Sequence, residues 1–415
     1  TYIVDAGDYY FTAATDSRNA VNNILAAKGY TVENTNGRMT EDGNTDLVWK
    51  WTNDTLDTTT FSTGANGTAI TNLFDESDPN KSSDAPGSVT WMSRSDWTGT
   101  IPTAPAQLTA NETLAASLAF TKYDGSEANS VEMPTLGAKN GLTLASMIGK
   151  DFDDPEWDTL LDQLTYSEMV NTITLGFHNT AAAASIGKTA TKDENGPQGL
   201  TAALTGGASA MCYTSEDVMA ATFNVDLINE VGRCIGEDCL AMGYSGLYGP
   251  GINMHRTAYC GRNFEYYSED PFVAGTICAA EVQGIQSKGV YVYLKHVALN
   301  DSETSRRGVN TWLNEQTARE IYLEVADKAI TDGGAWSVMT GFNRWGATWC
   351  GANANLLTGF LRGELGMRGM CITDFSGSSQ YMDLVDGLIA GSDIWDSPMP
   401  KIHTTKAANY ENDAY

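Results

Sequence analysis

The stretch Pro271–His296, PFVAGTICAAEVQGIQSKGVYVYLKH, carries the pattern that decides the fold. Residues 271–286 have the pattern of a helix, and residues 290–294 (VYVYL) form a short run without polar alternation. Such a run is typical of a strand that is buried on both faces. A helix that leads directly into such a strand predicts one unit of a parallel sheet with crossover helices.

The same unit repeats on both sides of this stretch. We predict helices over residues 215–242, 315–331 and 356–365, and strands over residues 246–249, 336–340 and 369–373. Eight such units typically need about 250 residues, and the chain from residue 152 onward supplies about that length. We therefore predict an α/β fold with a TIM-like (β/α)8 barrel. An open doubly wound sheet is the weaker alternative, because its nucleotide-type glycine-rich turn is missing from the sequence.

The first 145 or so residues differ from the rest in composition, because they are rich in Thr, Asn, Asp, Ser and Gly. A strand is predicted at residues 9–12 and a helix at residues 16–28, which Asp16 or Ser17 could cap and Gly29 could end. Residues 34–95 are dense in turn residues with isolated aromatics, which favours an irregular segment.

Composition excludes several classes of partner. The 52 acidic and 25 basic residues give a net charge of −27, so we expect neither nucleic acid nor an anionic membrane as partner. The seven scattered cysteines predict free thiols instead of a disulfide framework. The sequence has no signal-peptide pattern and no apolar run of membrane-spanning length. We expect a secreted or cell-surface location in preference to a cytoplasmic one, and we predict no cofactor and no metal site, since His178 and His403 lack partners at metal spacing.

Polar residues gather where the predicted strands end, and reacting groups of a βα-barrel lie there. Lys295 and His296 follow one strand, Asp374 follows another, and Arg262 lies in the loop after a third. Sugar chemistry needs a carboxylate beneath the anomeric carbon, and cations that bind hydroxyls and keep that carboxylate ionised. We therefore expect an ionised Asp374 with a depressed pKa, although a single Asp after a strand is also common as a helix N-cap.

Four segments carry a resemblance to a known family. They are YGPGINMHRTAYCGRNFEYYSEDP (248–271), KGVYVYLKHVALNDSETSR (288–306), WSVMTGFN (336–343) and GELGMRGMCITDF (363–375). In this order they closely resemble the barrel of glycoside hydrolase family 3, in its β-glucosidase-like branch. The resemblance implies a retaining, exo-acting β-glycosidase that hydrolyses terminal β-linked sugars by double displacement through an aspartyl glycosyl-enzyme.

The resemblance also implies roles for individual residues. Asp374 is expected to be the nucleophile. The expected substrate-binding residues are Asn195, Arg262, Lys295, His296, Glu303, Arg306 and Phe375. Three positions depart from the family pattern: Asn195 replaces an Asp, Phe342 a Tyr and Phe375 a Trp. Since Asn195 accepts with only one oxygen, either the substrate differs from plain glucosides or Asp193 and Glu194 reach into the site instead.

The resemblance extends to the domain organisation. Residues 1–37 resemble the C-terminal tail of a fibronectin-like β-sandwich domain, residues 38–150 are expected to be an irregular linker wrapping the barrel, and residues 151–415 the barrel, truncated at its last helix. The general acid of such enzymes comes from an α/β-sandwich domain, which we expect outside this chain, in an upstream segment or partner chain of a domain-permuted member. The expected binding partner is a carbohydrate substrate. Whether the chain forms a homo-oligomer is left open.

Two other functions remain open at this point. A non-catalytic sugar-binding barrel of the same fold is the main alternative, because of Asn195 and Phe342. The third hypothesis is that the protein is a phosphorylase or a transglycosylase.

Overall fold

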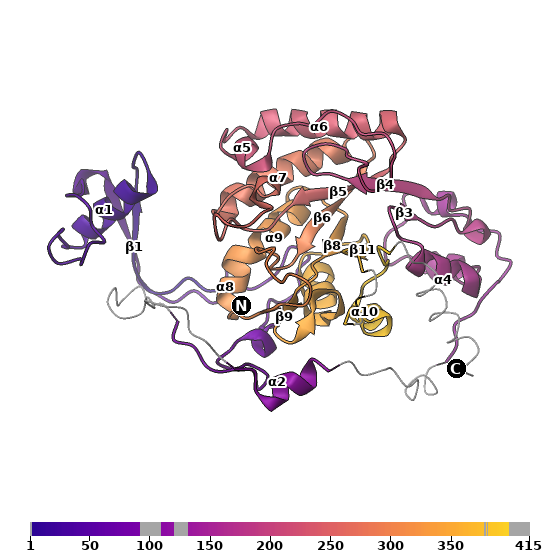
Figure 1. Ribbon diagram of the computed structural model, residues 1–415, viewed down its shortest axis with the longest axis horizontal. Coiled ribbons are helices and arrows are strands. Elements are labelled where there is room, and N and C mark those ends of the chain that lie inside the picture. The colour runs from indigo at the N-terminus through magenta and orange to yellow at the C-terminus, as the bar shows by residue number, and fades with distance from the viewer. Residues whose placement is uncertain (1, 92–108, 120–131, 377–378, 380, 398–415) are drawn as a thin grey trace. The chain divides into compact units, whose positions relative to one another are not determined.

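A computed structural model describes residues 2–91, 109–119, 132–376, 379 and 381–397. By its internal contacts the chain divides into two compact units, one of Thr1–Asn72 with Ser88–Leu108 and one of Leu73–Gly87 with Thr109–Tyr415. Figure 1 labels their helices and strands.

The first unit contains an antiparallel strand pair and one helix. Strand β1 (Gly7–Thr12) pairs with β2 (Val48–Asn53), and η1 (Thr45–Leu47) precedes β2. Helix α1 (Ser17–Ala27) is capped by Asp16, whose side chain accepts from the Asn19 N–H. The predicted strand and helix are confirmed. The stretch 34–95, however, contains β2, which its dense turn residues concealed.

The second unit is built on a six-stranded sheet. Its spatial order is β11 (Cys371–Thr373), β8 (Ser337–Thr340), β6 (Tyr291–Val297), β5 (Gly246–Gly251), β4 (Thr191–Asn195) and β3 (Asn179–Thr180). All neighbours are parallel except β3 and β4, which form an antiparallel pair. The spatial order follows the chain order without reversal. A doubly wound sheet reverses its order at a switch point, so the weaker alternative is excluded.

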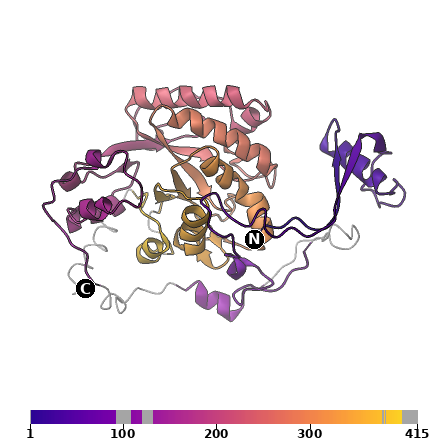
Figure 2. The ribbon, with the colours of Figure 1, turned by 180° about the vertical axis from the view of Figure 1, so that it is seen from behind.

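The sheet curls into part of a barrel, as the two opposite views show (Figures 1 and 2). Ile394 forms a parallel bridge with Ile372 beside β11. The described residues do not close an eight-stranded barrel, so that part of the prediction is corrected to a curled half-barrel. The reason lies in the segment that precedes β3, where α3 (Glu156–Leu161) and α4 (Tyr166–Thr174) follow one another with no strand between them. An antiparallel hairpin then forms the sheet edge.

Helices connect the parallel strands as predicted, with local differences. Between β4 and β5 lie α5 (Glu216–Ala220) and α6 (Val225–Met242), which were predicted as one helix. They are separate because Phe223 has a left-handed φ of 51° and Asn224 caps α6. Helix α7 (Pro271–Gln286) joins β5 to β6 with the predicted bounds.

The later crossovers contain π-helical turns. The predicted helix 315–331 comprises α8 (Glu315–Thr317), the π-helix η7 (Ala318–Tyr322) and α9 (Glu324–Thr331). The next crossover is the π-helix η9 (Asn355–Glu364), and α10 (Leu384–Ala390) follows β11.

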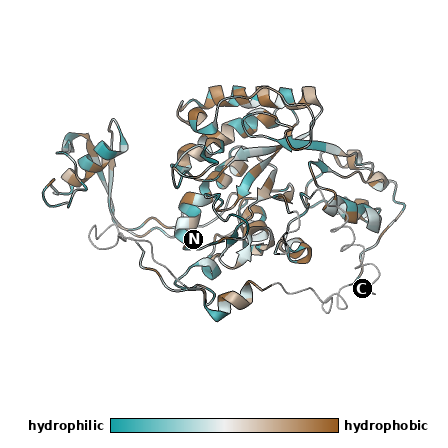
Figure 3. Ribbon diagram, viewed as in Figure 1, coloured by the Kyte–Doolittle hydropathy of each residue, from teal (hydrophilic) through white to brown (hydrophobic). Residues whose placement is uncertain are grey.

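Close packing of α6 on α7 anchors the core. A Cβ added at Gly232 would lie 2.3 Å from the Glu281 carbonyl oxygen, and one at Gly284 would lie 2.2 Å from the Asn229 carbonyl oxygen. Glycine is therefore required at both positions for the backbones to approach. Figure 3 shows hydrophobic and hydrophilic segments alternating along α6, as expected for a helix with one buried face.

Strand β4 is the exception within this apolar sheet. Its sequence TKDEN colours it hydrophilic in Figure 3, yet Asp193 and Glu194 are fully buried. Buried carboxyls need hydrogen-bond partners, so this strand indicates a region of the interior that is organised by hydrogen bonds and not by apolar packing.

The remaining elements are short. A small sheet has the order β10 (Thr348–Trp349), β9 (Arg344–Trp345) and β7 (Asn310–Thr311). The other helices are α2 (Glu112–Ser117) and the 3-10 turns η2 (Asp75–Ser77), η4 (Leu144–Met147), η5 (Ala184–Ile186), η6 (Asn263–Glu265) and η8 (Cys350–Ala352). Within the described ranges, no helix has both the length and the apolarity needed to cross a bilayer. All seven cysteines are free thiols, as predicted.

Candidate active site

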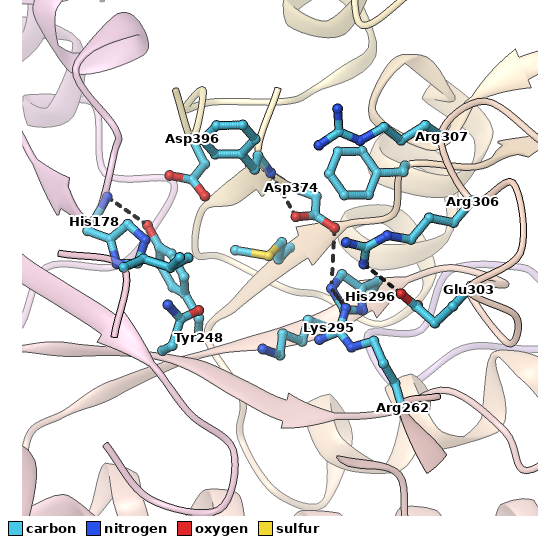
Figure 4. Close-up of a pocket in the computed structure, with 15 residues that line it drawn as sticks. His178, Tyr248, Arg262, Lys295, His296, Glu303, Arg306, Arg307, Asp374 and Asp396 are labelled. Atoms are coloured by element: carbon cyan, nitrogen blue, oxygen red, sulfur yellow. Dashed lines mark hydrogen bonds and ion pairs between the residues drawn. The ribbon is translucent and has the colours of Figure 1, made fainter. Parts of the chain in front are cut away.

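A cavity of about 400 Å³ lies at the carboxyl ends of the parallel strands. It receives side chains from β4, from the loop after β5, from β6 and from the segments after β6, β8 and β11. Every residue that the sequence predicts for the site lines this cavity, namely Asn195, Arg262, Lys295, His296, Glu303, Arg306, Asp374 and Phe375. Figure 4 shows how these side chains converge.

Asp374 follows β11 and is held by backbone contacts. Its N–H donates to the Thr340 carbonyl at 3.1 Å, and its Oδ1 accepts from the Phe375 N–H at 2.7 Å. It does not cap a helix, because α10 begins ten residues later at Leu384 and is capped by Asp383. The carboxylate therefore faces the cavity as a strand-end group.

The pKa of Asp374 lies above its usual value, because the carboxyl is buried. The positive charge of Arg262, the Phe375 N–H and the charges of Arg306 and Lys295 lower the pKa, in that order, without cancelling the effect of burial. The predicted depression of this pKa is therefore wrong in direction. The cations surround the carboxyl as expected, but desolvation outweighs them.

Glu265 links the cations of the site. Arg262 donates from Nε to Glu265 Oε1 at 3.1 Å and makes a second bond to Oε2, while Lys295 Nζ lies 3.7 Å from Oε2. Burial lowers the pKa of Lys295, and the Glu265 carboxylate opposes this. The sequence pattern contained Glu265 but indicated no role for it. Its position after a short strand, beside Arg262, is the signal that could have identified it.

His296 is a neutral imidazole at the centre of the network. Burial, followed by the charges of Arg262, Lys295 and Arg306, holds its pKa well below the usual value. Its backbone is fixed by Asn253, whose side chain accepts from the His296 N–H at 2.9 Å and donates to its carbonyl at 3.0 Å. Asn253 is a second residue whose role the sequence did not indicate.

The loop after β6 contributes Glu303, Arg306 and Arg307. Arg306 forms an ion pair with Glu303 at 3.2 Å. The guanidinium groups of Arg306 and Arg307 lie over the Phe342 ring, 4.9 Å and 5.3 Å from its centroid. The Phe342 ring thus contacts two cations of the cavity wall through its face.

Asn195 lies at the end of β4 and is held by its neighbour. Glu194 Oε1 accepts from the Asn195 N–H at 2.9 Å and from its side-chain amide at 3.2 Å, and lies 2.8 Å from His178 Nδ1. Asp193 instead accepts from the hydroxyls of Tyr291 and Tyr293. Neither acid is among the residues that line the cavity, so of the two alternatives the structure disfavours the one in which Asp193 and Glu194 replace Asn195.

Phe342, which the sequence analysis singled out as a departure from the family pattern, also lines the cavity. The structure adds residues that the sequence did not indicate for the site, namely His178, Leu204, Tyr248, Arg307, Met339 and Asp396. Asp396 follows the bridge at Ile394, so it is a strand-end polar residue like Asp374, and the same signal could have identified it. In the part of the chain that the structure describes, no group of three or more His, Cys, Asp or Glu side chains is placed to hold a metal ion.

Comparison with known proteins gives relatives of one kind. Residues 178–393 match the family described as "Glycosyl hydrolase family 3 N terminal domain". The thermostable beta-glucosidase B of Acetivibrio thermocellus is 34% identical over 253 residues, covering 59% of this chain and 33% of that protein. An exo-alpha-(1->6)-L-arabinopyranosidase of Bifidobacterium longum is 34% identical over 190 residues, covering 44% of this chain and 25% of that protein.

Solved structures agree with these relatives. Beta-glucosidase 3B from Thermotoga neapolitana, in complex with glucose, superposes with a TM-score of 0.56 at 30% identity. The likeness covers 62% of this chain and 39% of that one. The chain thus spans a third or less of the length of the first curated relatives it matches. Because the family match takes in more than half of its 415 residues, the chain belongs to glycosyl hydrolase family 3.

Proposed function

We propose that this chain supplies the sugar site and the nucleophile of a retaining, exo-acting β-glycosidase. The observation that carries the proposal is the position of Asp374, which lines the cavity with 13% of its side chain exposed and lies near the charges of Arg262, Lys295 and Arg306. Its ionised oxygen attacks the anomeric carbon, the bond to the leaving oxygen breaks, and an aspartyl ester of the sugar forms. Water then attacks the same carbon and releases the sugar with Asp374 restored.

The other predicted residues bind the sugar. Arg262 and Lys295 donate to hydroxyls near the anomeric carbon, and neither can compete with Asp374 as an acceptor. His296, being neutral, can donate or accept according to its tautomer. Glu303 positions Arg306 through their ion pair, and Phe375 provides an apolar wall of the cavity. Asn195 presents an amide to the sugar.

The general acid is proposed to come from outside this chain. Three carboxyls line the cavity: Glu303 is paired with Arg306, Asp374 is the nucleophile, and Asp396 is 4% exposed. None of them is placed as an exposed acid beside a leaving group. An α/β-sandwich segment or a partner chain is therefore proposed as the proton donor, in keeping with the much greater length of the relatives.

The domain organisation is part of the same proposal. We assign residues 1–37 to the tail of a fibronectin-like domain, 38–150 to a linker and 151–415 to the barrel. The exposed ring of Phe11 on β1 supports the first assignment, since a two-stranded ribbon with exposed apolar rings needs a packing partner. Strand β2, which pairs with β1 and exposes Trp49 and Trp51, belongs to the segment assigned to the linker. A secreted or cell-surface location stays a prediction.

The substrate is proposed to be a glycoside with a terminal β-linked sugar. The test is hydrolysis of 4-nitrophenyl β-D-glucopyranoside and related glycosides by this chain alone and by this chain combined with an α/β-sandwich segment or partner chain that supplies the proposed general acid. Turnover that needs this addition and is independent of phosphate supports the proposal. Sugar binding without turnover in both forms supports the non-catalytic barrel, which the departures at Asn195 and Phe342 favour. Turnover that requires phosphate indicates a phosphorylase.

A further inference from the structure

We propose that Asp396 is a specificity-determining sugar-binding residue, whose carboxyl accepts a hydrogen bond from a ring hydroxyl at the side of the cavity away from Arg262 and Arg306. This inference rests on the proposed function, and it concerns a residue beyond the stretch that matches the family.

The backbone of Asp396 is fixed beside the nucleophile. Its N–H donates to the Thr373 hydroxyl at 3.0 Å, and its carbonyl accepts from the Ser376 N–H at 2.9 Å. Both partners flank Asp374, so the two carboxyls belong to neighbouring strand ends. The backbone of Asp396 therefore cannot shift without disturbing the loop that carries Asp374.

The carboxyl of Asp396 is incompletely paired. The residue is 4% exposed and forms no ion pair within the described part of the chain, and its Oδ1 has no hydrogen-bond partner there. Burial and the charge of Asp374 raise its pKa well above the usual value, while the His178 N–H opposes this. The buried acids of β4 differ, since hydroxyls and His178 satisfy Asp193 and Glu194. A buried, incompletely paired carboxyl is costly, and a ligand donor would offset that cost.

The position of Asp396 indicates which part of a sugar it meets. In Figure 4, Asp396, His178 and Tyr248 lie on one side of Asp374, whereas Arg262, Arg306 and Glu303 lie on the other. With the anomeric carbon over Asp374 and the neighbouring hydroxyls among the cations, the far side of a pyranose ring extends toward Asp396. A ring hydroxyl on that side of the sugar can donate a hydrogen bond to the carboxyl of Asp396.

Asp396 is not assigned as the general acid. In an exo-acting enzyme the leaving group extends from the cavity into solvent, so its proton donor must face the opening. Asp396 is instead buried and fixed between Thr373 and Ser376. Binding of the retained sugar is the role that this position allows.

Sugar binding tests the proposal, using the full chain and titration calorimetry. The ligands are glucose, galactose, xylose and arabinose, together with the 4-deoxy and 6-deoxy analogues of the hexoses. The variants are D396A and D396N. The control is D386N, which removes an exposed carboxyl of α10 in the same segment.

The expected result has two parts. D396A should weaken binding of the preferred sugar about 3- to 10-fold, the range for an ordinary hydrogen bond. It should also lose the wild-type preference for that sugar over the deoxy analogue that lacks the partner hydroxyl. D396N should retain part of the binding and part of this preference, because its amide oxygen still accepts from the hydroxyl. D386N should match the wild type.

Thermal unfolding supplies a readout that a structural role would not produce. Since D396N removes a buried, incompletely paired acid, its unfolding midpoint should equal or exceed that of the wild type at pH 8. Two outcomes overturn the inference while leaving the proposed function in place: unchanged discrimination between the preferred sugar and its deoxy analogues in D396A, or a marked loss of stability in D396N. A wild-type chain that binds no pyranose overturns both.

Discussion

His296 Nε2 lies 3.3 Å from Asp374 Oδ2 and 3.0 Å from Nη1 of Arg262. A neutral imidazole thus separates the proposed nucleophile from the cation that most lowers its pKa. Arg262 therefore acts on the charge of Asp374 past a neutral ring, and not through a direct ion pair, while burial has the largest effect on the pKa of Asp374.

The pH dependence of the reaction at Asp374 should change most when the neighbouring charge that most lowers its pKa is removed. Because attack needs the ionised carboxylate, the rate of reaction at Asp374 should fall as the pH drops through its raised pKa. R262M removes the charge with the largest lowering effect, so the acid limb should move to higher pH by about one unit or more. R306M should move it less, since Arg306 contributes less.

The control for this prediction is R262K, which keeps the charge and should leave the acid limb near its wild-type position. The measurement is the rate of inactivation by an activated fluoro-sugar between pH 4 and pH 8. An acid limb that stays in place or moves to lower pH in R262M would show that Arg262 does not set the ionisation of Asp374.

Asn195 should resist conversion to the aspartate that the family usually carries. Glu194 Oε1 accepts both the backbone N–H and the side-chain amide of Asn195, so N195D would remove a donor and bring two carboxylates together. We expect a loss of unfolding free energy of about 1–3 kcal/mol at pH 7, together with weaker sugar binding.

The double variant E194Q/N195D should recover part of that loss, because the glutamine amide can donate to the new carboxylate. Urea denaturation of the four proteins of the cycle measures the coupling. A stable N195D chain with improved sugar binding would contradict the account of Glu194.

A buried acid pair beneath the site should make stability fall as the pH rises. Burial raises the pKa of Glu216 and of Glu281, and the two carboxyls act on each other. The unfolded chain releases these protons near the ordinary value and the folded chain only at higher pH, so the penalty appears between the two pKa values and persists above them. Tyr267 donates to Glu281 at 2.6 Å, and an amide oxygen can accept that bond equally well.

E281Q should therefore be more stable than the wild type at pH 8, by about 1–3 kcal/mol. At pH 4 the two proteins should have similar stability. Chemical denaturation at both pH values measures the difference, and E320Q, which alters an exposed acid, serves as control. Equal stability of E281Q and wild type at pH 8 would mean that the pair carries no unfavourable charge in the folded state.

Much of the fold was predictable because its signals are local. The apolar run VYVYL and the helix capped by Asp16 can each be recognised from the residues within them and at their ends. Helix α7 has the predicted bounds. The site was predictable for the same reason, since strand ends place Lys295, His296 and Asp374 around one opening.

What could not be predicted depends on contacts distant in sequence. The break before α6 arises from one left-handed residue, Phe223, and strand β2 exists through its pairing with β1 across more than thirty residues. The direction of the Asp374 pKa shift depends on how deeply the fold buries the carboxyl. Sequence shows the cations but not the desolvation that outweighs them.

The most direct test of the central claim is covalent trapping with 2-deoxy-2-fluoro-β-D-glucosyl fluoride. Fluoride leaves without a proton, so the outcome does not depend on where the proposed general acid comes from. Peptide mass mapping should place one fluoroglucosyl group on Asp374, and D374N should take up none while still binding sugar. A label on any other residue, or an unlabelled wild-type chain that binds the sugar, would contradict the assignment of Asp374 as nucleophile.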